Sequence, residues 1–148
     1  MKTNIYLDTT VISALFDKRT PERMIQTQQF WEYINGYNVF ISELVIDEIK
    51  GASQPLQNIM LDKVSSFTSL SVTDEVKHLA GVYIKNEVFP EKYLDDALHT
   101  ALASTNRINI LLSWNFTHLV KVKTRRMVAL INAIYNYDPV EIISPPEL

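Results

Sequence analysis

The sequence predicts an α/β fold, a three-layer α/β/α sandwich around a central, mainly parallel sheet of four to five strands. Two observations support this prediction. Ile5-Tyr6-Leu7 is an uninterrupted apolar run, as is typical of a strand buried on both faces of a parallel sheet, and further short segments rich in apolar residues recur along the chain. Segments with helical spacing of apolar residues lie between these runs, and strands that alternate with helices form βαβ units. Because no repeat, linker or low-complexity segment is present, we expect residues 1–148 to form a single domain.

Five segments are predicted to be strands, because each is short and rich in Ile, Leu, Val or Phe. The first ends directly before Asp8, and the last precedes the prolines at positions 145 and 146. The predicted strands are residues 5–7, 38–41, 70–72, 108–112 and 140–143.

The predicted helices are marked by residues that favour helix ends. Pro21 suits the first turn of a helix that Gly36 ends. Ser42 is a favoured N-cap, and Thr73 with the acids that follow it opens another helix. The predicted helices are a short one over residues 12–16, and residues 21–36, 42–51, 55–67, 73–87, 93–106 and 126–135.

The composition excludes several classes of function. The chain has no cysteine, which rules out disulfides and thiolate zinc sites, and its three histidines lack metal-ligand spacing. A net charge of -3 argues against a protein that coats nucleic acid through bulk charge. No apolar run is long enough to span a membrane, and no signal peptide is recognisable, so we expect a cytoplasmic protein without membrane contact.

Asp8 directly follows the first predicted strand, together with the hydroxyl groups of Thr9 and Thr10. Ligands bind beyond the carboxyl ends of strands in open α/β sheets, so a carboxylate at this place is a candidate functional group. The alternative is that Asp8 only caps a helix that begins near Thr9, because Asp is a favoured N-cap. On these residues alone the two interpretations have equal weight.

Glu48 is the unusual acid of the helix predicted over residues 42–51. At 100° per residue, Glu43 and Asp47 fall on the polar face, whereas Glu48 falls within the apolar arc. A carboxylate on the buried face is costly unless it is paired, hydrogen-bonded or bound to metal. Because the helix follows directly on a strand, we expect Glu48 to lie near the sheet edge that carries Asp8.

Asp95 and Asp96 occupy the first turn of the helix predicted over residues 93–106. Acids in a first turn interact favourably with the helix dipole by ~0.3–1 kcal/mol, which gives both a purely structural explanation. Spacing alone does not choose between them as a functional acid. His99 lies one turn from both, and we expect a partly buried histidine that hydrogen-bonds to one of them.

Polar side chains follow the fourth predicted strand, at Ser113 and Asn115. Asn115 offers an amide oxygen to a metal or water, or makes an Asx turn, and this stretch alone favours the turn. Trp114 and Phe116 are expected to pack in the core, with stacking on RNA bases as the alternative.

The gathering of such oxygen ligands at one sheet edge would create a metal site. Carboxylates brought close together raise one another's pKa unless a cation neutralises them. All-oxygen ligation selects Mg²⁺ or Mn²⁺ rather than zinc. An ion held in this way orients and deprotonates water and stabilises charge on phosphate, which suits the hydrolysis of phosphodiesters.

Taken together, the motifs resemble those of the PIN-domain superfamily, and within it the small VapC-type toxin ribonucleases. The similarity covers nearly the whole chain. Residues 5–12 resemble the family's opening strand and aspartate, and residues 42–49 its second acidic motif. Residues 96–101 resemble the third motif, which favours Asp96 over Asp95. Residues 113–115 resemble the fourth, where many members carry Thr-x-Asp.

The resemblance implies a PIN-like domain over residues 1–148 that acts as a Mg²⁺- or Mn²⁺-dependent endoribonuclease, the toxin of a toxin–antitoxin pair. It implies that Asn115 supports a metal site whose carboxylates are Asp8, Glu48 and Asp96, and that Thr9 and Ser113 position water or phosphate. Because Asn115 replaces an acid, we expect a one-metal site or a slow enzyme. Members commonly bind a small antitoxin and form homodimers, so RNA, an antitoxin and a second copy are the expected partners.

A basic cluster follows the fourth motif and is a candidate contact for RNA phosphates or for an acidic antitoxin tail. Two of its members are expected to open a helix, where their charges oppose the helix dipole, so helix stability does not explain them. A solvated basic face is the alternative. The cluster consists of Lys121, Lys123, Arg125 and Arg126, and a second, weaker patch of Lys18, Arg19 and Arg23 lies near the first strand.

Two other functions fit the same residues. Phosphatases of the haloacid dehalogenase type also begin with a strand that ends in a nucleophilic aspartate, here Asp8, but Thr10 stands where most of them carry a second acid. A PIN-like module that binds RNA or a protein partner and has lost cleavage through Asn115 is the non-enzymatic alternative.

Overall fold

A computed structural model describes residues 1–148 and contains one sheet of five strands, all parallel, in the order β3-β2-β1-β4-β5. The predicted mainly parallel sheet is therefore confirmed. The strands are β1 (Thr3–Leu7), β2 (Tyr37–Ser42), β3 (Thr68–Leu70), β4 (Ile110–Leu112) and β5 (Glu141–Ile143).

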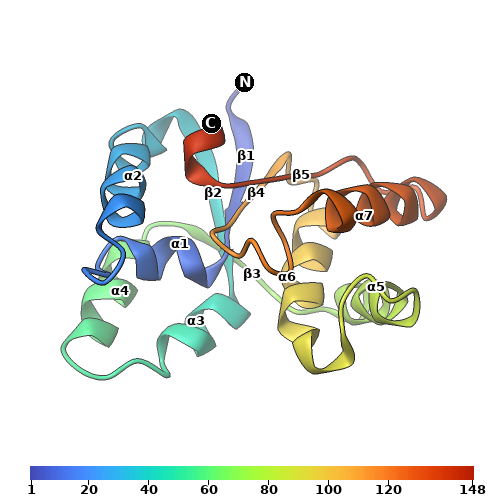
Figure 1. Ribbon diagram of the computed structural model, residues 1–148, viewed down its shortest axis with the longest axis horizontal. Helices are drawn as coiled ribbons and strands as arrows, with labels where there is room; N and C mark the ends of the chain where they lie inside the picture. The colour runs from blue at the N-terminus through green and yellow to red at the C-terminus, as the bar shows by residue number, and fades with distance from the viewer.

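Seven α-helices cover both faces of the sheet, which confirms the three-layer α/β/α arrangement. Figure 1 shows α1 to α4 on one side of the strands and α5 to α7 on the other. None of the helices combines the length and apolar character needed to cross a membrane. The helices are α1 (Thr9–Ala14), α2 (Pro21–Glu32), α3 (Glu43–Ile49), α4 (Leu56–Val64), α5 (Asp74–Lys85), α6 (Leu94–Thr105) and α7 (Val122–Ile134).

Side-chain caps fix the start of three helices as the sequence predicts. Asp8 accepts a hydrogen bond from the Val11 N–H at the start of α1, so its role as an N-cap is real. Ser42 and Thr73 cap α3 and α5 in the same way. Because Ser42 is also the last residue of β2, α3 begins directly at the carboxyl end of that strand.

Several predicted boundaries are wrong: α1 begins at Thr9 and not at residue 12, α2 ends at Glu32 and not at residue 36, α4 ends at Val64 and not at residue 67, and β4 begins at Ile110 and not at residue 108. Two further differences have a clear local cause. The third strand ends at Leu70, not at residue 72, because the Val72 N–H donates to the Glu43 carboxylate at 2.7 Å instead of joining the sheet. The last long helix begins at Val122, before residue 126, because Thr124 is buried and donates its hydroxyl to the His118 carbonyl at 2.9 Å. Because the buried residue of this first turn is a threonine, the spacing of apolar residues does not predict that the helix starts there.

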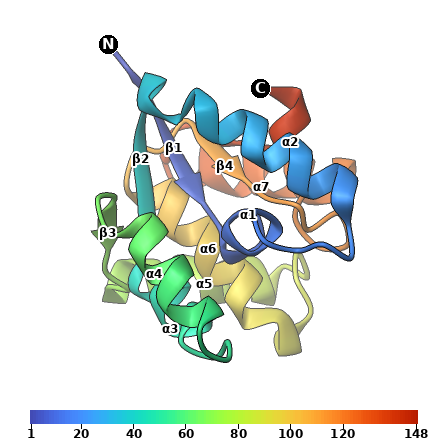
Figure 2. The same ribbon diagram turned by 90° about the vertical axis from the view of Figure 1, so that its left-hand side faces the viewer.

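The middle strand, β1, aligns the carboxyl ends of its neighbours. Ile5, Tyr6 and Leu7 are fully buried, as predicted for a strand covered on both faces. Leu7 pairs with Leu112 of β4, and the Asp8 N–H continues the ladder by donating to the Leu112 carbonyl at 3.2 Å. The residues that follow β1, β2 and β4 therefore meet at one edge of the sheet, and Figure 2 shows these strands side by side behind α1 and α2.

Candidate functional site

Asp8 lies at the centre of this edge and is held by hydroxyl groups from two elements. Thr10 donates to Oδ1 at 2.5 Å, and Ser113, which follows β4, donates to Oδ2 at 2.5 Å. The Asp8 residue is only 2% exposed. Its carboxylate is thus fixed in orientation by both of its oxygens.

A buried chain of hydrogen bonds runs from the central strand to α3. The Tyr6 hydroxyl lies 2.8 Å from Ser42 Oγ and 2.7 Å from Nδ1 of His99. The other ring nitrogen of His99, Nε2, lies 2.8 Å from Oε1 of Glu48. Because His99 is 3% exposed, this chain is shielded from water until it reaches Glu48.

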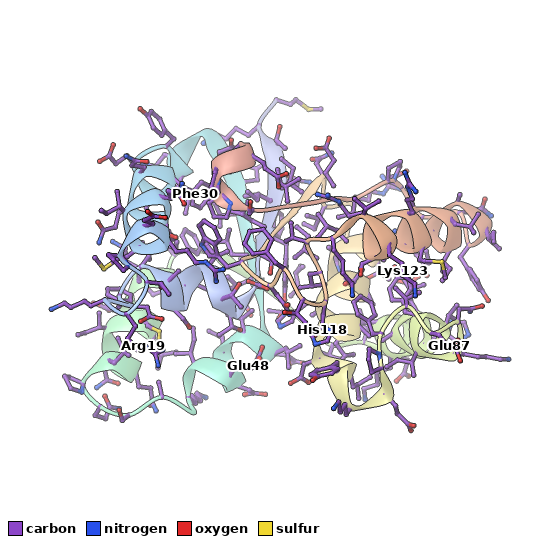
Figure 3. The ribbon with its side chains drawn as sticks, in the orientation of Figure 1. Arg19, Phe30, Glu48, Glu87, His118 and Lys123 are labelled. Carbon is purple, nitrogen blue, oxygen red and sulfur yellow. The ribbon has the colours of Figure 1, made fainter.

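Glu48 is the acid of α3 that turns toward the other acids, as its position in the apolar arc predicts. Its side chain is 33% exposed, and it accepts hydrogen bonds from His99 and from the Thr9 hydroxyl, the latter at 2.9 Å. Asp47, on the same helix, is exposed, and its side chain makes no hydrogen bond or ion pair. Figure 3 labels Glu48 on α3, with His118 nearby on the loop that follows β4.

Asp96, and not Asp95, contacts another residue of the candidate site. Asp96 is half-buried and its Oδ1 accepts a hydrogen bond from the Asn115 side-chain amide at 3.2 Å, whereas Asp95 is exposed and makes no hydrogen bond or ion pair through its side chain. The amide oxygen of Asn115 accepts from the His118 N–H at 3.0 Å, three residues further on, so it caps the turn that follows and does not form the predicted Asx turn, whose donor lies two residues away. Asn115 therefore positions Asp96 through its nitrogen.

The surroundings of His99 carry an excess of negative charge, because three carboxylates, Asp8, Glu48 and Asp96, act on one imidazole. Burial raises the pKa of Asp8, and the His99 charge and the donor hydroxyls only partly oppose it. Burial also raises the pKa of Asp96, and repulsion by Asp8 and Glu48 adds to the effect. Burial alone would raise the pKa of Glu48, but the hydrogen bond and charge of His99 outweigh it and lower the value.

The donor set suits a hard divalent cation by its chemistry. Asp8, Glu48 and Asp96 offer only oxygen atoms, and two of the three have raised pKa values that a nearby cation would lower. The side chains as they stand do not form a closed cage: no three acids or histidines converge on one point that could hold a metal ion. That these acids and Asn115 are metal ligands stays a prediction.

Two further expectations about the site are wrong, and Tyr6 is a site residue that the sequence analysis does not single out. Phe116 is 45% exposed and does not pack in the core, whereas Trp114 is buried as predicted. His99 bonds to neither acid of its own helix, because Tyr6 and Glu48 take both ring nitrogens. Sequence reasoning gave Tyr6 no role, although a tyrosine within a fully buried strand signals a hydroxyl that needs a partner. The hydroxyl of Thr10, which the sequence places beside Asp8 without a defined role, donates to Asp8 Oδ1.

Of the basic cluster that follows the fourth motif, one member, Arg125, makes contacts within the protein. Arg125 donates to the Ile142 carbonyl at 3.3 Å and lies 3.9 Å from the Glu147 carboxylate. In Figure 3 Lys123 is on α7, on the far side of His118 from Glu48. The exposed members are Lys121, Lys123 and Arg126.

Comparison with solved structures identifies the fold. A toxin–antitoxin complex from Klebsiella pneumoniae matches with a TM-score of 0.60 at 16% identity, over 81% of this chain and 93% of that chain. VapBC2 from Rickettsia felis, bound to a DNA fragment from its promoter, matches with a TM-score of 0.59 at 12% identity, over 95% and 98%. VapBC-5 from Mycobacterium tuberculosis matches with a TM-score of 0.54 at 15% identity, over 94% and 96%.

The fold is that of VapC-type PIN domains. No model of a protein family matches the sequence, and no curated protein gives a significant match. The likeness to the VapC-type fold thus lies in three-dimensional structure and extends over most of the chain. It agrees with the resemblance drawn from the motifs at the ends of β1, β2 and β4 and at the start of α6.

Proposed function

We propose that the chain is a divalent-metal-dependent endoribonuclease of the VapC type and the toxin of a toxin–antitoxin pair. The observation that carries this proposal is the gathering of Asp8, Glu48 and Asp96, from three separate elements, around His99 at the carboxyl edge of a parallel sheet. Ligands bind at this edge in open α/β sheets. The VapC-type fold supports the same assignment.

In this proposal the three carboxylates hold Mg²⁺ or Mn²⁺. The ion, when bound, would supply an activated water molecule and stabilise the charge that builds on the phosphodiester. Asn115 contributes no charge, and we infer that it keeps Asp96 turned toward the site through its side-chain amide.

The remaining side chains orient the acids. Thr10 and Ser113 fix both oxygens of Asp8, so that the carboxylate needs no reorganisation when substrate arrives. Thr9 and His99 do the same for Oε1 of Glu48. His99 is itself held by Tyr6, which makes it a positioning residue.

A partner follows from the same proposal. The structures that share the fold are described as toxin–antitoxin or VapBC assemblies, and we infer that a small antitoxin protein binds this chain. Formation of a homodimer and binding of RNA are parts of the proposal that solution mass measurements and binding assays would test.

Cleavage of single-stranded RNA in the presence of Mg²⁺ or Mn²⁺ is the decisive test. We expect wild-type protein to cleave, EDTA to stop cleavage, and Asp8→Asn and Asp96→Asn each to lower the rate at least a hundredfold. Asp95→Asn is the matched control, because it makes the same change one residue away at an exposed position, and it should retain activity.

The alternatives give different results in the same assay. RNA binding without cleavage at any metal concentration would indicate a binding module and overturn the nuclease. Turnover of a small phosphate ester through a covalent aspartyl phosphate would indicate a phosphatase. The burial of Asp8 and the hydrogen bonds to both of its oxygens disfavour such a nucleophile.

A further inference from the structure

A cavity of about 350 Å³ opens beside the acids, between α1 and the start of α2. It shares Thr9 and Glu48 with the candidate site, so it lies next to that site. Hydroxyl groups dominate its polar wall, and a single arginine, Arg23, lines it. The other hydroxyl-bearing residues of the wall are Thr10, Ser13 and Thr20.

Arg23 is held over two aromatic rings and has no acidic partner. Its guanidinium carbon lies 5.3 Å from the ring centroid of Trp114 and 5.3 Å from that of Phe116. Its side chain makes no ion pair and no hydrogen bond within the chain, whereas the nearby Arg19 is paired with Asp17 at 2.9 Å. A guanidinium stacked on aromatic faces keeps its N–H donors free and directed for a planar or tetrahedral anion.

The aromatic platform is fixed to the same residues that hold Asp8. The Trp114 N–H donates to Thr10 Oγ1 at 2.9 Å, and the Trp114 indole N–H donates to Thr27 Oγ1 at 2.9 Å. Thr10 in turn bonds to Asp8. The position of the Arg23 guanidinium relative to Asp8 is therefore set by a short chain of contacts through Trp114 and Thr10.

We propose that Arg23 binds a phosphate of single-stranded RNA adjacent to the scissile phosphate, with the cavity as the subsite for that nucleotide. This inference rests on the proposed nuclease function. The hydroxyl-lined wall suits ribose and phosphate oxygens, and Phe116, which is 45% exposed, offers a face on which a base stacks. A carboxylate-rich peptide is a poorer match, because RNA alone supplies a ribose for the hydroxyl-lined wall and a base for the face of Phe116.

Arg23→Gln tests this assignment through RNA affinity measured without metal, so that cleavage does not interfere. We expect the dissociation constant of a short labelled single-stranded RNA to rise about tenfold. The slope of log K against log salt should become shallower by about 0.7, the value for one lost phosphate contact on a single strand. Arg23→Lys keeps the charge but not the planar fork, and it should restore the slope with only part of the affinity.

Arg107→Gln is the matched control, because it removes the same charge from an exposed position just before β4, at the opposite end of that strand from Ser113. It should leave affinity and slope unchanged. In the cleavage assay Arg23→Gln should raise KM with kcat almost unaltered, as expected for a residue that binds rather than reacts.

The outcomes separate this proposal from the nuclease itself. Equal RNA affinity and equal salt slope for Arg23→Gln and Arg107→Gln would overturn the role of Arg23, even if the wild-type protein cleaves RNA. Loss of binding to an acidic peptide with unchanged RNA binding would also overturn it and assign Arg23 to a protein partner. Binding of RNA that depends on Arg23 in a protein that never cleaves would support the subsite and reject the nuclease.

Discussion

His99 Nε2 lies 2.8 Å from Glu48 Oε1, and this contact joins α6 on one face of the sheet to α3 on the other. The two residues are 51 positions apart in the sequence. Through Nδ1 the same imidazole reaches Tyr6 on the central strand. One side chain thus connects all three layers at the edge where the acids gather.

Removal of either side chain of the buried Tyr6–His99 hydrogen bond should destabilise the protein. We expect Tyr6→Phe and His99→Gln each to lower the free energy of unfolding by about 1–3 kcal/mol, because each leaves a buried polar group without its partner. The double variant should lower the free energy of unfolding by less than the sum of the two single effects, with a difference of about 0.5 kcal/mol or more. Urea denaturation measures all three values. Tyr83→Phe, which removes a buried hydroxyl bonded to Ser104 and Asn132 and to no residue of the candidate site, should be additive with His99→Gln and leave cleavage intact.

The stability of the metal-free protein should fall as the pH rises past neutrality. Burial lowers the pKa of His99, but the hydrogen bond to Glu48 and the charges of Asp8, Glu48 and Asp96 outweigh it and raise the value above 6.5. Protonated His99 therefore stabilises the folded state fully below the unfolded pKa, and this contribution is lost as pH rises through the higher folded pKa. Melting temperatures in EDTA across about pH 6 to 9 measure the slope. A slope unchanged in His99→Gln would contradict this account.

Asp8→Asn should make the metal-free protein more stable while it abolishes cleavage. Burial raises the pKa of Asp8, so its ionised form is unfavourable at neutral pH. Asn keeps the N-cap and an acceptor for one of the two hydroxyls. We expect a higher melting temperature in EDTA, by about 2–4 °C for each kcal/mol gained. A variant that melts lower than wild type would show that the charged carboxylate is favourable without a cation.

Asn115→Asp should make the metal-free protein less stable and cleavage faster. The substitution replaces the amide donor that contacts Asp96 with a second carboxylate, while the acceptor for the His118 N–H is retained. We expect a loss of about 1–3 kcal/mol in EDTA from repulsion and the lost hydrogen bond. Mn²⁺ should raise the melting temperature more than it does in wild type, and cleavage should become faster. An identical response to Mn²⁺ in both proteins would argue against a metal beside Asp96.

Arg125→Gln should affect stability slightly and RNA affinity little. Its guanidinium is engaged by the Ile142 carbonyl and by Glu147, and a partly exposed ion pair of this kind is worth ~0–1 kcal/mol. Its neighbour Arg126 is exposed, and Arg126→Gln makes the same charge change as a control. A larger loss of RNA affinity in Arg125→Gln than in Arg126→Gln would show that RNA displaces the internal contact.

The fold and the positions of Asp8 and Glu48 were predictable because they depend on local patterns, whereas only the family resemblance favoured Asp96 over Asp95. An apolar run followed by a carboxylate identifies β1 and Asp8, and the position of Glu48 on its helix singles it out from Glu43 and Asp47. The partners of His99 were not predictable, because the choice among Asp95, Asp96 and Glu48 depends on how α6 is rotated against the sheet. Packing of whole side chains sets that rotation.

The contacts of Arg23 were not predictable from the sequence either. Its distance from Trp114 in the sequence hides the stacking, which exists only because α2 packs beside the loop that follows β4. The sequence identifies a weak basic patch there but does not separate the paired Arg19 from the unpaired Arg23.

The location of Trp114 makes the protein its own optical reporter. Its indole ring touches the Arg23 guanidinium on one side, and its backbone is bonded to the threonine that holds Asp8. The chain has only one other tryptophan, Trp31, which packs against Phe67. With Trp31→Phe as background, ultraviolet emission at equilibrium would follow nucleotide occupancy beside the acids without any attached dye.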